Sequence, residues 1–281
     1  MSKINLKINF VGDFLKLKTV LTIAGSDSIG GAGIQADIKT ITMHGVYATT
    51  AITAVTAQNT IGVQDILEVP PYLLKKQLDS IFTDIYPDAV KIGMVSSENL
   101  IEVIAESLKF YKAKNIVVDP VMVSGTGCKL FSGKYSVVLA KKLFSISNLV
   151  TPNLFEAEVI SGEKIFNLSD LIKVSKKISA KYNCNVLCKG GHLEDNSNDV
   201  LFLKNNNDCI ILKSEKINNK NTHGTGCTLS SAIASNLALG NDLIKSVKNA
   251  KKYVYTSISS MLNLGNGVGP INHMFCKEFL I

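Results

Sequence analysis

The residues best suited to chemistry lie near the end of the sequence, in the run Asn221-Thr222-His223-Gly224-Thr225-Gly226-Cys227-Thr228. Its glycines let the backbone approach a ligand closely, and the residues that follow predict a helix. A helix N-terminus offers unpaired N–H groups and a partial positive charge. We therefore expect this run to hold an anion, such as the oxygens of a transferring phosphoryl group. A plain glycine-rich helix start is the alternative.

Cys227 falls in the first turn of this expected helix, where a thiol pKa can be lowered. Two chemical uses compete: a base toward a substrate hydroxyl, or the nucleophile of a Cys-His hydrolase together with His223. The hydrolase needs an orienting third group and an oxyanion hole, and the sequence identifies neither. An inert, packed thiol is the third interpretation.

Two common nucleotide-binding motifs are missing from the sequence. The Walker A pattern G-x-x-x-x-G-K-[ST] occurs nowhere in the chain. The run Gly30-Gly31-Ala32-Gly33 has the wrong spacing for the dinucleotide fingerprint G-x-G-x-x-G. A nicotinamide-dependent dehydrogenase is therefore disfavoured, and a phosphate site would have to use other groups.

The elements that must position these residues alternate between short β-type runs and longer helical ones. This order predicts an α/β fold, a three-layer α/β/α arrangement with a mostly parallel central sheet and helices on both faces. Strands are expected over 19–24, 47–57, 89–94, 116–120, 148–151 and 185–189, with a hairpin over 199–213. Helices are expected over 32–44, 70–82, 97–111, 134–144, from 153, 168–182, 224–239 and 241–262.

Polar residues and glycines gather directly after these expected strands. In an open parallel sheet, ligands bind beyond the carboxyl ends of the strands. The six strand ends that carry polar residues or glycines therefore predict one ligand-binding crevice. The residues that mark it are Gly25-Ser26-Asp27, Gln58-Asn59, Gly93-Met94, Asp119, Asn153 and Lys189-Gly190-Gly191.

The 281-residue chain has a net charge of +7, and all 30 of its Lys and Arg residues are Lys. The lysines are scattered and no Arg fork is present, so a nucleic-acid partner is not expected. Six Cys without a C-x-x-C pair disfavour a zinc site or a disulfide framework. With no signal peptide and no membrane-spanning run evident, we expect a cytoplasmic protein without membrane partners. One domain is expected over 19–281, and residues 1–18 form an unassigned extension.

Eight motifs in register, over roughly residues 19–273, make the chain resemble the ribokinase-like superfamily. Within it the chain closely resembles the hydroxymethylpyrimidine/phosphomethylpyrimidine kinases of thiamine biosynthesis. The motifs are Leu21-Thr22-Ile23-Ala24-Gly25-Ser26-Asp27, Gly30-Gly31-Ala32-Gly33-Ile34-Gln35-Ala36-Asp37, Ala57-Gln58-Asn59-Thr60, Lys91-Ile92-Gly93-Met94, Val118-Asp119-Pro120-Val121-Met122, Thr151-Pro152-Asn153, Lys189-Gly190-Gly191-His192 and the run from Asn221 to Thr228.

The resemblance implies a substrate pocket. In the family, the glutamine of A-Q-N-T hydrogen-bonds the aminopyrimidine, so Gln58 is expected to bind the substrate. A primary amide suits this role because it offers a donor and an acceptor side by side. Asp37, Met94, Gly25 and Val121 are expected to complete the pocket.

The resemblance also implies ATP and Mg²⁺. Asp119 and Glu156 are expected near the metal, directly or through water. Lys189 is expected to neutralise phosphate oxygens as a point charge. In the wider superfamily the motif is G-T-G-D with an Asp base, and here Cys227 takes the fourth position. The remaining phosphate- and ATP-binding residues are expected to be Asn153, Thr222, Gly224, Thr225 and Gly226.

By this resemblance the protein phosphorylates the pyrimidine alcohol first and its monophosphate second. A pyridoxal kinase, or an enzyme with both activities, is the nearest rival. A non-catalytic pyrimidine- or nucleotide-binding sensor is the rival from another class. The family suggests a homodimer. A mobile loop is expected over 123–130, and 185–189 and 216–221 are candidate walls for adenine.

Overall fold

The computed structural model describes residues 16–122, 133–191 and 198–275. Within them, one nine-stranded sheet has the strand order β3-β2-β1-β4-β5-β6-β7-β8-β9. The strands are β1 (Thr19–Asp27), β2 (Tyr47–Gln58), β3 (Val63–Glu68), β4 (Ala89–Ile92), β5 (Ile116–Val118), β6 (Leu149–Val150), β7 (Asn185–Cys188), β8 (Asp199–Leu203) and β9 (Asp208–Leu212).

The centre of the sheet is parallel and its edges are antiparallel. Strands β2, β1, β4, β5, β6 and β7 run in one direction. Strand β3 pairs antiparallel with β2, while β8 and β9 form an antiparallel hairpin beyond β7. Because β2 and β4 flank β1 on opposite sides, the chain changes winding direction there. Ligands bind at such a switch point, beyond the carboxyl ends of the strands.

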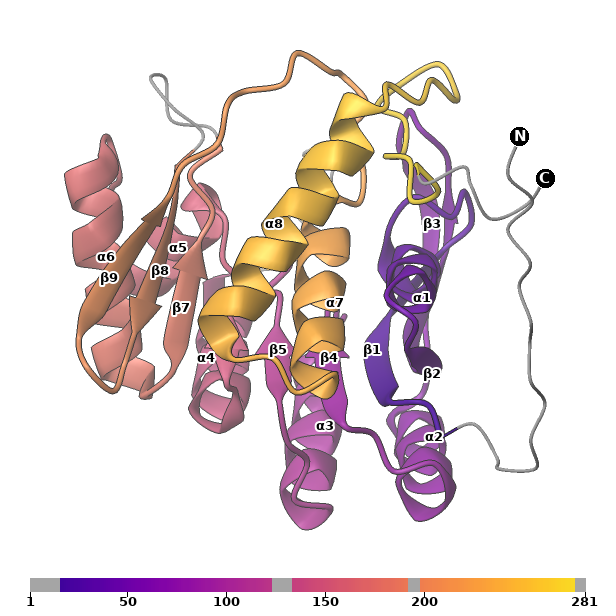
Figure 1. Cartoon of the computed structure of the whole chain (residues 1–281). Coiled ribbons are helices and arrows are strands. Elements are labelled where there is room, and N and C mark those ends of the chain that lie inside the picture. The colour runs from indigo at the N-terminus through magenta and orange to yellow at the C-terminus, as the bar shows by residue number, and fades with distance from the viewer. Residues whose placement is uncertain (1–15, 123–132, 192–197, 276–281) are drawn as a thin grey trace.

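Helices cover both faces of the sheet, which confirms the expected three-layer fold (Figure 1). Helices α1, α7 and α8 pack on one face, and α2 to α6 pack on the other. They are α1 (Gly33–Met43), α2 (Pro71–Asp84), α3 (Glu98–Phe110), α4 (Gly133–Leu143), α5 (Leu154–Ser161), α6 (Leu168–Tyr182), α7 (Thr225–Ala238) and α8 (Leu243–Ser259), with a 3₁₀ turn η1 (Phe144–Ile146) after α4.

Local residue chemistry sets several helix boundaries. Ser97, Asn167 and Asp242 each accept a backbone N–H with the side chain at the start of α3, α6 and α8. Helix α5 begins with a capping box between Asn153 and Glu156. The expected helices are all present, with ends that shift by a few residues, whereas β3 was not predicted.

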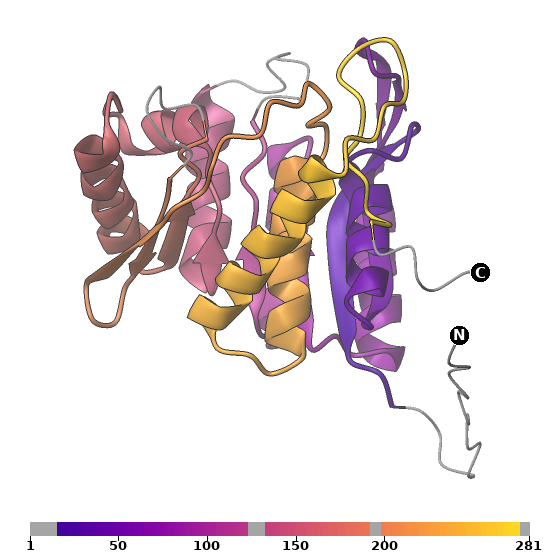
Figure 2. The same cartoon turned by 45° about the horizontal axis from the view of Figure 1, so that its top comes forward.

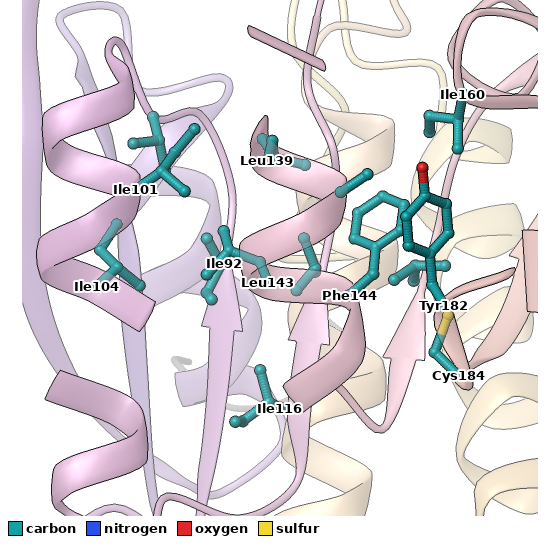
Figure 3. Packing of buried hydrophobic residues seen from close by; sticks show 14 of the residues in the cluster. Ile92, Ile101, Ile104, Ile116, Leu139, Leu143, Phe144, Ile160, Tyr182 and Cys184 are labelled. Carbon is teal, nitrogen blue, oxygen red and sulfur yellow. The ribbon is translucent and has the colours of Figure 1, made fainter. Parts of the chain in front are cut away.

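The larger of two apolar clusters fills the layer between the sheet and helices α2 to α6. Figure 3 shows part of it, with Phe144 beside Tyr182 and with Ile92 and Ile101 nearby. The rings of Phe144 and Tyr182 meet edge to face at 5.3 Å. Cys184 belongs to the same cluster, as expected for a small buried thiol, and burial raises its pKa to about 12.

The segment after α8 returns to the β2–β3 turn. Figure 2 shows it beside the tip of these two strands. The N–H groups of Asn266 and Gly267 donate to Oγ1 of Thr60, and Val268 N–H donates to its carbonyl. This segment therefore ties the end of the chain to the strand that carries Gln58.

No helix among the described residues has the length and apolarity needed to cross a membrane. The loop expected over 123–130 and most of the extension expected over 1–18 lie outside the described residues.

We predict that Phe144→Ala lowers the free energy of unfolding by about 3–5 kcal/mol, because it leaves a cavity in the core. Urea denaturation followed by circular dichroism measures this. Phe166→Ala is the matched control: Phe166 is 80% exposed, so its loss should change stability by less than about 0.5 kcal/mol. Equal urea midpoints for the two variants would contradict the packing.

Candidate active site

A cavity of about 720 Å³ lies at the carboxyl ends of the parallel strands, where the sequence predicts a crevice. Its walls come from the ends of β1, β2, β5 and β7, the starts of α5 and α7, the segment before α7, and α8. The predicted residues that line it are Gly25, Gln58, Met94, Val121, Asp119, Asn153, Glu156, Lys189, Thr222, Gly224, Thr225, Gly226 and Cys227. Asp37 is the predicted site residue that does not line it.

Glycines allow three loops of the cavity to pack backbone against backbone. Gly224 has φ +84°, and a Cβ there would lie 1.8 Å from the carbonyl oxygen of Gly31. Gly33 has φ +56°, and its Cβ would lie 2.2 Å from the carbonyl oxygen of Gly25. No other residue type fits these contacts without displacing the backbone. The start of α7 is thus fixed against the end of β1 and the start of α1.

Helix α7 begins at Thr225 without a side-chain cap at Gly224. The Thr225 hydroxyl and N–H both donate to the carbonyl of Thr222. The next N–H groups, those of Gly226 and Cys227, remain without helical partners in the first turn. Both residues line the cavity, and a helix N-terminus with such N–H groups attracts an anion.

Asp119 and Lys189 form an ion pair beneath this helix start. Lys189 Nζ lies 2.9 Å from Asp119 Oδ1, which also accepts the Thr151 hydroxyl at 2.9 Å. A Cβ on Gly226 would lie 3.2 Å from Asp119 Oδ2, so the glycine keeps the loop close to the carboxylate. Burial alone would lower the pKa of Lys189, but Asp119 and Glu156 outweigh it and raise that pKa. The neighbouring carboxylates therefore favour the charged form of Lys189.

Glu156 is buried and held by the backbone. Its carboxylate accepts the N–H of Asn153 at 2.8 Å and that of Met122 at 3.3 Å. Burial raises its pKa to about 7, although Lys189 acts in the opposite direction. Glu156 thus lies in the same electrostatic cluster as Lys189 and Asp119.

The described residues contain no group of three His, Cys, Asp or Glu side chains suited to a metal. Mg²⁺ does not require such a group, since it keeps several waters and uses one or two carboxylates together with substrate phosphates. Asp119 and Glu156 fit that limited role: both line the cavity, and both are close enough to Lys189 to shift its pKa.

Asp37 lies under the cavity, which corrects its expected place in the substrate pocket. Its Oδ2 accepts Lys91 Nζ at 2.7 Å and the Thr22 hydroxyl at 2.6 Å, while Oδ1 accepts the Ser231 hydroxyl at 2.6 Å. Asp37 and Lys91 are fully buried. Burial alone would lower the pKa of Lys91, but Asp37 raises it. The sequence contained no local signal for this pair.

Cys227 does not have the low pKa that a position at a helix start can produce. Burial raises the pKa of its thiol to about 11, and the opposing effects of Lys91 and the Gly33 N–H are smaller. Burial therefore outweighs the positive potential of the helix start here. The thiol is protonated at neutral pH.

Asp27 and His223 form a second buried pair that sequence reasoning missed. Asp27 Oδ2 lies 2.9 Å from Nε2 of His223, and the Gln58 amide lies 3.3 Å from the same nitrogen. Burial alone would raise the pKa of Asp27, but hydrogen bonds, first among them that from His223, lower it. The imidazole nitrogen thus faces Asp27 and Gln58, which gives the Cys-His hydrolase no support.

The far end of the cavity lies between the segment before α7 and helix α8. Lys216, Ile217 and Asn219 line one side, so the expected wall at 216–221 does reach the cavity. Tyr255 and Ile258 of α8 line the other side and were not predicted. From 185–189, Lys189 lines the cavity.

The sequence profile of the phosphomethylpyrimidine kinase family matches residues 27–272. The hydroxymethylpyrimidine/phosphomethylpyrimidine kinase of Haemophilus influenzae is 40% identical over 260 residues, which cover 92% of this chain and 97% of that protein. A thiamine biosynthesis bifunctional protein of Geobacter sulfurreducens is 45% identical over 92% of this chain. The match covers 53% of that relative, so the chain spans about half its length.

Solved structures show the same fold. The phosphomethylpyrimidine kinase of Clostridium difficile has a TM-score of 0.77 and 45% identity, covering 86% of this chain and 99% of that one. The pyridoxal kinase of Bacillus subtilis, in an ADP complex, has a TM-score of 0.86 and 34% identity, covering 94% and 100%. This chain is thus similar to kinases of both kinds.

We predict that iodoacetamide alkylates Cys227 slowly at pH 7 and about tenfold faster for each pH unit between about 7 and 10, because the thiolate is the reactive form. Peptide-level mass spectrometry measures the rate. Cys209, which is exposed, serves as the internal reference for reagent activity. A Cys227 rate that levels off below about pH 8 would restore the low pKa first expected.

Proposed function

The chain belongs to the phosphomethylpyrimidine kinase family, and from that membership we propose that it transfers the γ-phosphate of ATP to 4-amino-5-hydroxymethyl-2-methylpyrimidine. A second transfer converts the resulting monophosphate to the diphosphate, which supplies the pyrimidine half of thiamine. The observation that carries the proposal is that one cavity is lined by Gln58, by Lys189 and the start of α7, and by Ile217 and Tyr255.

The acceptor end of the cavity suits a small flat ring with polar edges. Gln58 offers an amide, while Met94 and Val121 contribute apolar surface. A Cβ on Gly25 would lie 2.5 Å from Cε of Met94, so glycine leaves space for the methionine beside the ring site. We assign these residues to pyrimidine binding.

The phosphate centre suits phosphoryl transfer through a loose transition state, in which positioning and charge stabilisation dominate. The N–H groups of Gly226 and Cys227 would hold transferring oxygens, and Lys189 would neutralise their charge. Asp119 and Glu156 would hold Mg²⁺, which supplies charge neutralisation at the β- and γ-phosphates when bound. Because the chain contains no Arg, Lys189 and the backbone N–H groups would have to bind the phosphate oxygens.

The far end of the cavity is proposed to hold the nucleoside of ATP. Ile217 on one side and Tyr255 and Ile258 on the other offer apolar surface for a flat base. Lys251 pairs with Asp199, which also accepts the N–H of Gly190 at 2.9 Å. This pair joins α8 to β8, and Asp199 also holds the residue that follows Lys189, so α8 is connected to the proposed phosphate centre.

A pyridoxal kinase, alone or as a second activity, is the alternative with a specific observation in its favour. The Bacillus subtilis pyridoxal kinase aligns over 94% of this chain. A non-catalytic sensor is disfavoured, because Asp119, Lys189 and the glycines around Thr225 are all in place.

We infer a cytoplasmic homodimer without nucleic-acid partners. The β2–β3 edge supports self-association, because Ile61, Ile66 and Leu67 expose apolar surface there. The scattered lysines give no basic stripe for nucleic acid.

We predict that the purified chain, supplied with ATP and Mg²⁺, phosphorylates hydroxymethylpyrimidine to the monophosphate and then to the diphosphate. Coupled detection of ADP with chromatographic separation of the products measures both steps. Turnover of pyridoxal in the same assay tests the alternative. Turnover of pyridoxal without turnover of the pyrimidine would contradict the proposal.

We further predict that Cys227→Ala slows the first phosphorylation by about 10²-fold and the second much less. The alcohol must lose a proton, whereas the monophosphate is already anionic, with a second pKa of about 6. Because the thiol pKa is about 11, the rate of the first step should rise with pH in the parent enzyme and lose that rise in the variant.

Separate kinetics on the two purified substrates test this prediction. Cys209→Ala, at an exposed thiol, is the matched control and should change neither step. If Cys227→Ala lowers the rates of both phosphorylations equally, Cys227 does not act as the base.

A further inference from the structure

The amide of Gln58 lies between two polar groups that are not equivalent. Nε2 of Gln58 is placed 3.3 Å from Nε2 of His223, and Oε1 of Gln58 is placed 3.4 Å from Oγ1 of Thr56; a 180° turn of the amide exchanges these two atoms. The Gln58 backbone is fixed, since its N–H donates to the Ser28 hydroxyl at 2.8 Å and its carbonyl accepts that hydroxyl at 2.7 Å. The orientation of the side-chain amide, that is, which of its two positions holds the oxygen, follows from the hydrogen-bonding groups around it.

The His223 side of the amide presents a hydrogen. Asp27 accepts the backbone N–H groups of Ile29 at 3.1 Å, Gly31 at 3.1 Å and Ala32 at 2.8 Å, and these bonds hold its carboxylate in the ionised form. Its lowered pKa agrees with this. An ionised carboxylate 2.9 Å from Nε2 of His223 requires an N–H at that nitrogen. A protonated Nε2 has no lone pair left to accept an amide N–H, so the atom of Gln58 that faces it should be the oxygen, which can share the N–H that Asp27 accepts.

The Thr56 side presents a lone pair. The Thr56 hydroxyl donates to the carbonyl of Ser26 at 2.9 Å, which uses its only hydrogen. The heteroatom of Gln58 that faces Thr56 must therefore donate. Both neighbours thus require the amide turned by 180° from its placement, with the oxygen toward His223 and the nitrogen toward Thr56.

We propose that His223, held by Asp27, acts with Thr56 to fix the Gln58 amide in this orientation, and that the fixed amide selects ligands with an amino donor beside a ring-nitrogen acceptor. This inference rests on the proposed function, because it specifies how the same site distinguishes pyrimidines. His223 and Thr56 are positioning residues, since they act through Gln58.

A 4-aminopyrimidine matches the fixed amide. Its amino group donates to the oxygen of Gln58, and the adjacent ring nitrogen accepts from the amide nitrogen. The 4-oxo isostere has the reverse pattern, with an acceptor oxygen beside a ring N–H. It leaves a donor facing a donor and an acceptor facing an acceptor, which a site built to hydrogen-bond its ligand rejects strongly. An amide free to rotate by 180° would accept either compound.

The test compares kcat/KM for the 4-amino substrate and its 4-oxo isostere, 5-hydroxymethyl-2-methylpyrimidin-4-one. The parent enzyme should favour the amino compound by about 10²-fold or more. In His223→Phe, which lacks the N–H, this ratio should fall by about tenfold or more. If His223 only supports the fold, both substrates lose activity equally, and an unchanged ratio would overturn the inference.

Two controls keep the test decisive. His223→Gln can place an N–H near the position of Nε2 and should keep the ratio near that of the parent. Thr56→Val removes the acceptor on the other side and should also lower the ratio, whereas Thr56→Ser should preserve it. Thermal melting followed by circular dichroism shows whether His223→Phe folds. If it does not fold, the comparison of Thr56→Val with Thr56→Ser tests the inference.

The outcomes separate the two proposals. A parent enzyme that phosphorylates neither pyrimidine contradicts the proposed function itself. A parent enzyme that is active on the amino compound, with the same ratio in Thr56→Val and any folded His223→Phe, contradicts this inference alone.

Discussion

The buried ion pair between Asp37 and Lys91 is the interaction on which the site depends. Its hydrogen bonds join four elements: Asp37 on α1, Lys91 on β4, Thr22 on β1 and Ser231 on α7. Loss of one partner of such a pair costs about 3–5 kcal/mol, because the other charge stays buried. Ser231 lies one helical turn after Cys227, so the pair also fixes the start of α7. The start of α7 and the centre of the sheet are thereby held by the same buried ion pair.

The two lysines near the proposed phosphate centre each form an ion pair with a carboxylate. Lys91 pairs with Asp37, and Lys189 pairs with Asp119. Each lysine pKa rises despite burial, because the carboxylates favour the ammonium form more than burial opposes it. The same burial keeps the Cys227 thiol protonated. The centre therefore supplies fixed positive charges and backbone N–H groups, whereas its thiol is a weak base. Phosphoryl transfer through a loose transition state depends mainly on such charge stabilisation.

Periodic features of the sequence predicted most of the fold, and the topology of a parallel sheet predicted where the site lies. Strand β3 was not predicted because its residues are largely exposed and show no apolar alternation. The pKa of Cys227 was misjudged because a local motif signals helix potential but not burial. Asp37 was misplaced because its motif fixes its helix but not the strand that this helix faces. The Asp27–His223 pair spans 196 positions, and no local pattern connects residues so far apart.

The recognition and transfer ends of the cavity share residues. His223 directly precedes the N-cap of α7, yet its ring lies against the Gln58 amide. The N–H of His223 donates to the carbonyl of Gly269, and the same segment contacts Thr60, two residues after Gln58. Any shift of the phosphate loop would therefore move the groups that orient the ring. Because an error of about 1 Å in alignment can cost about 10²-fold in rate, this shared attachment would keep the two ends of the proposed site in register.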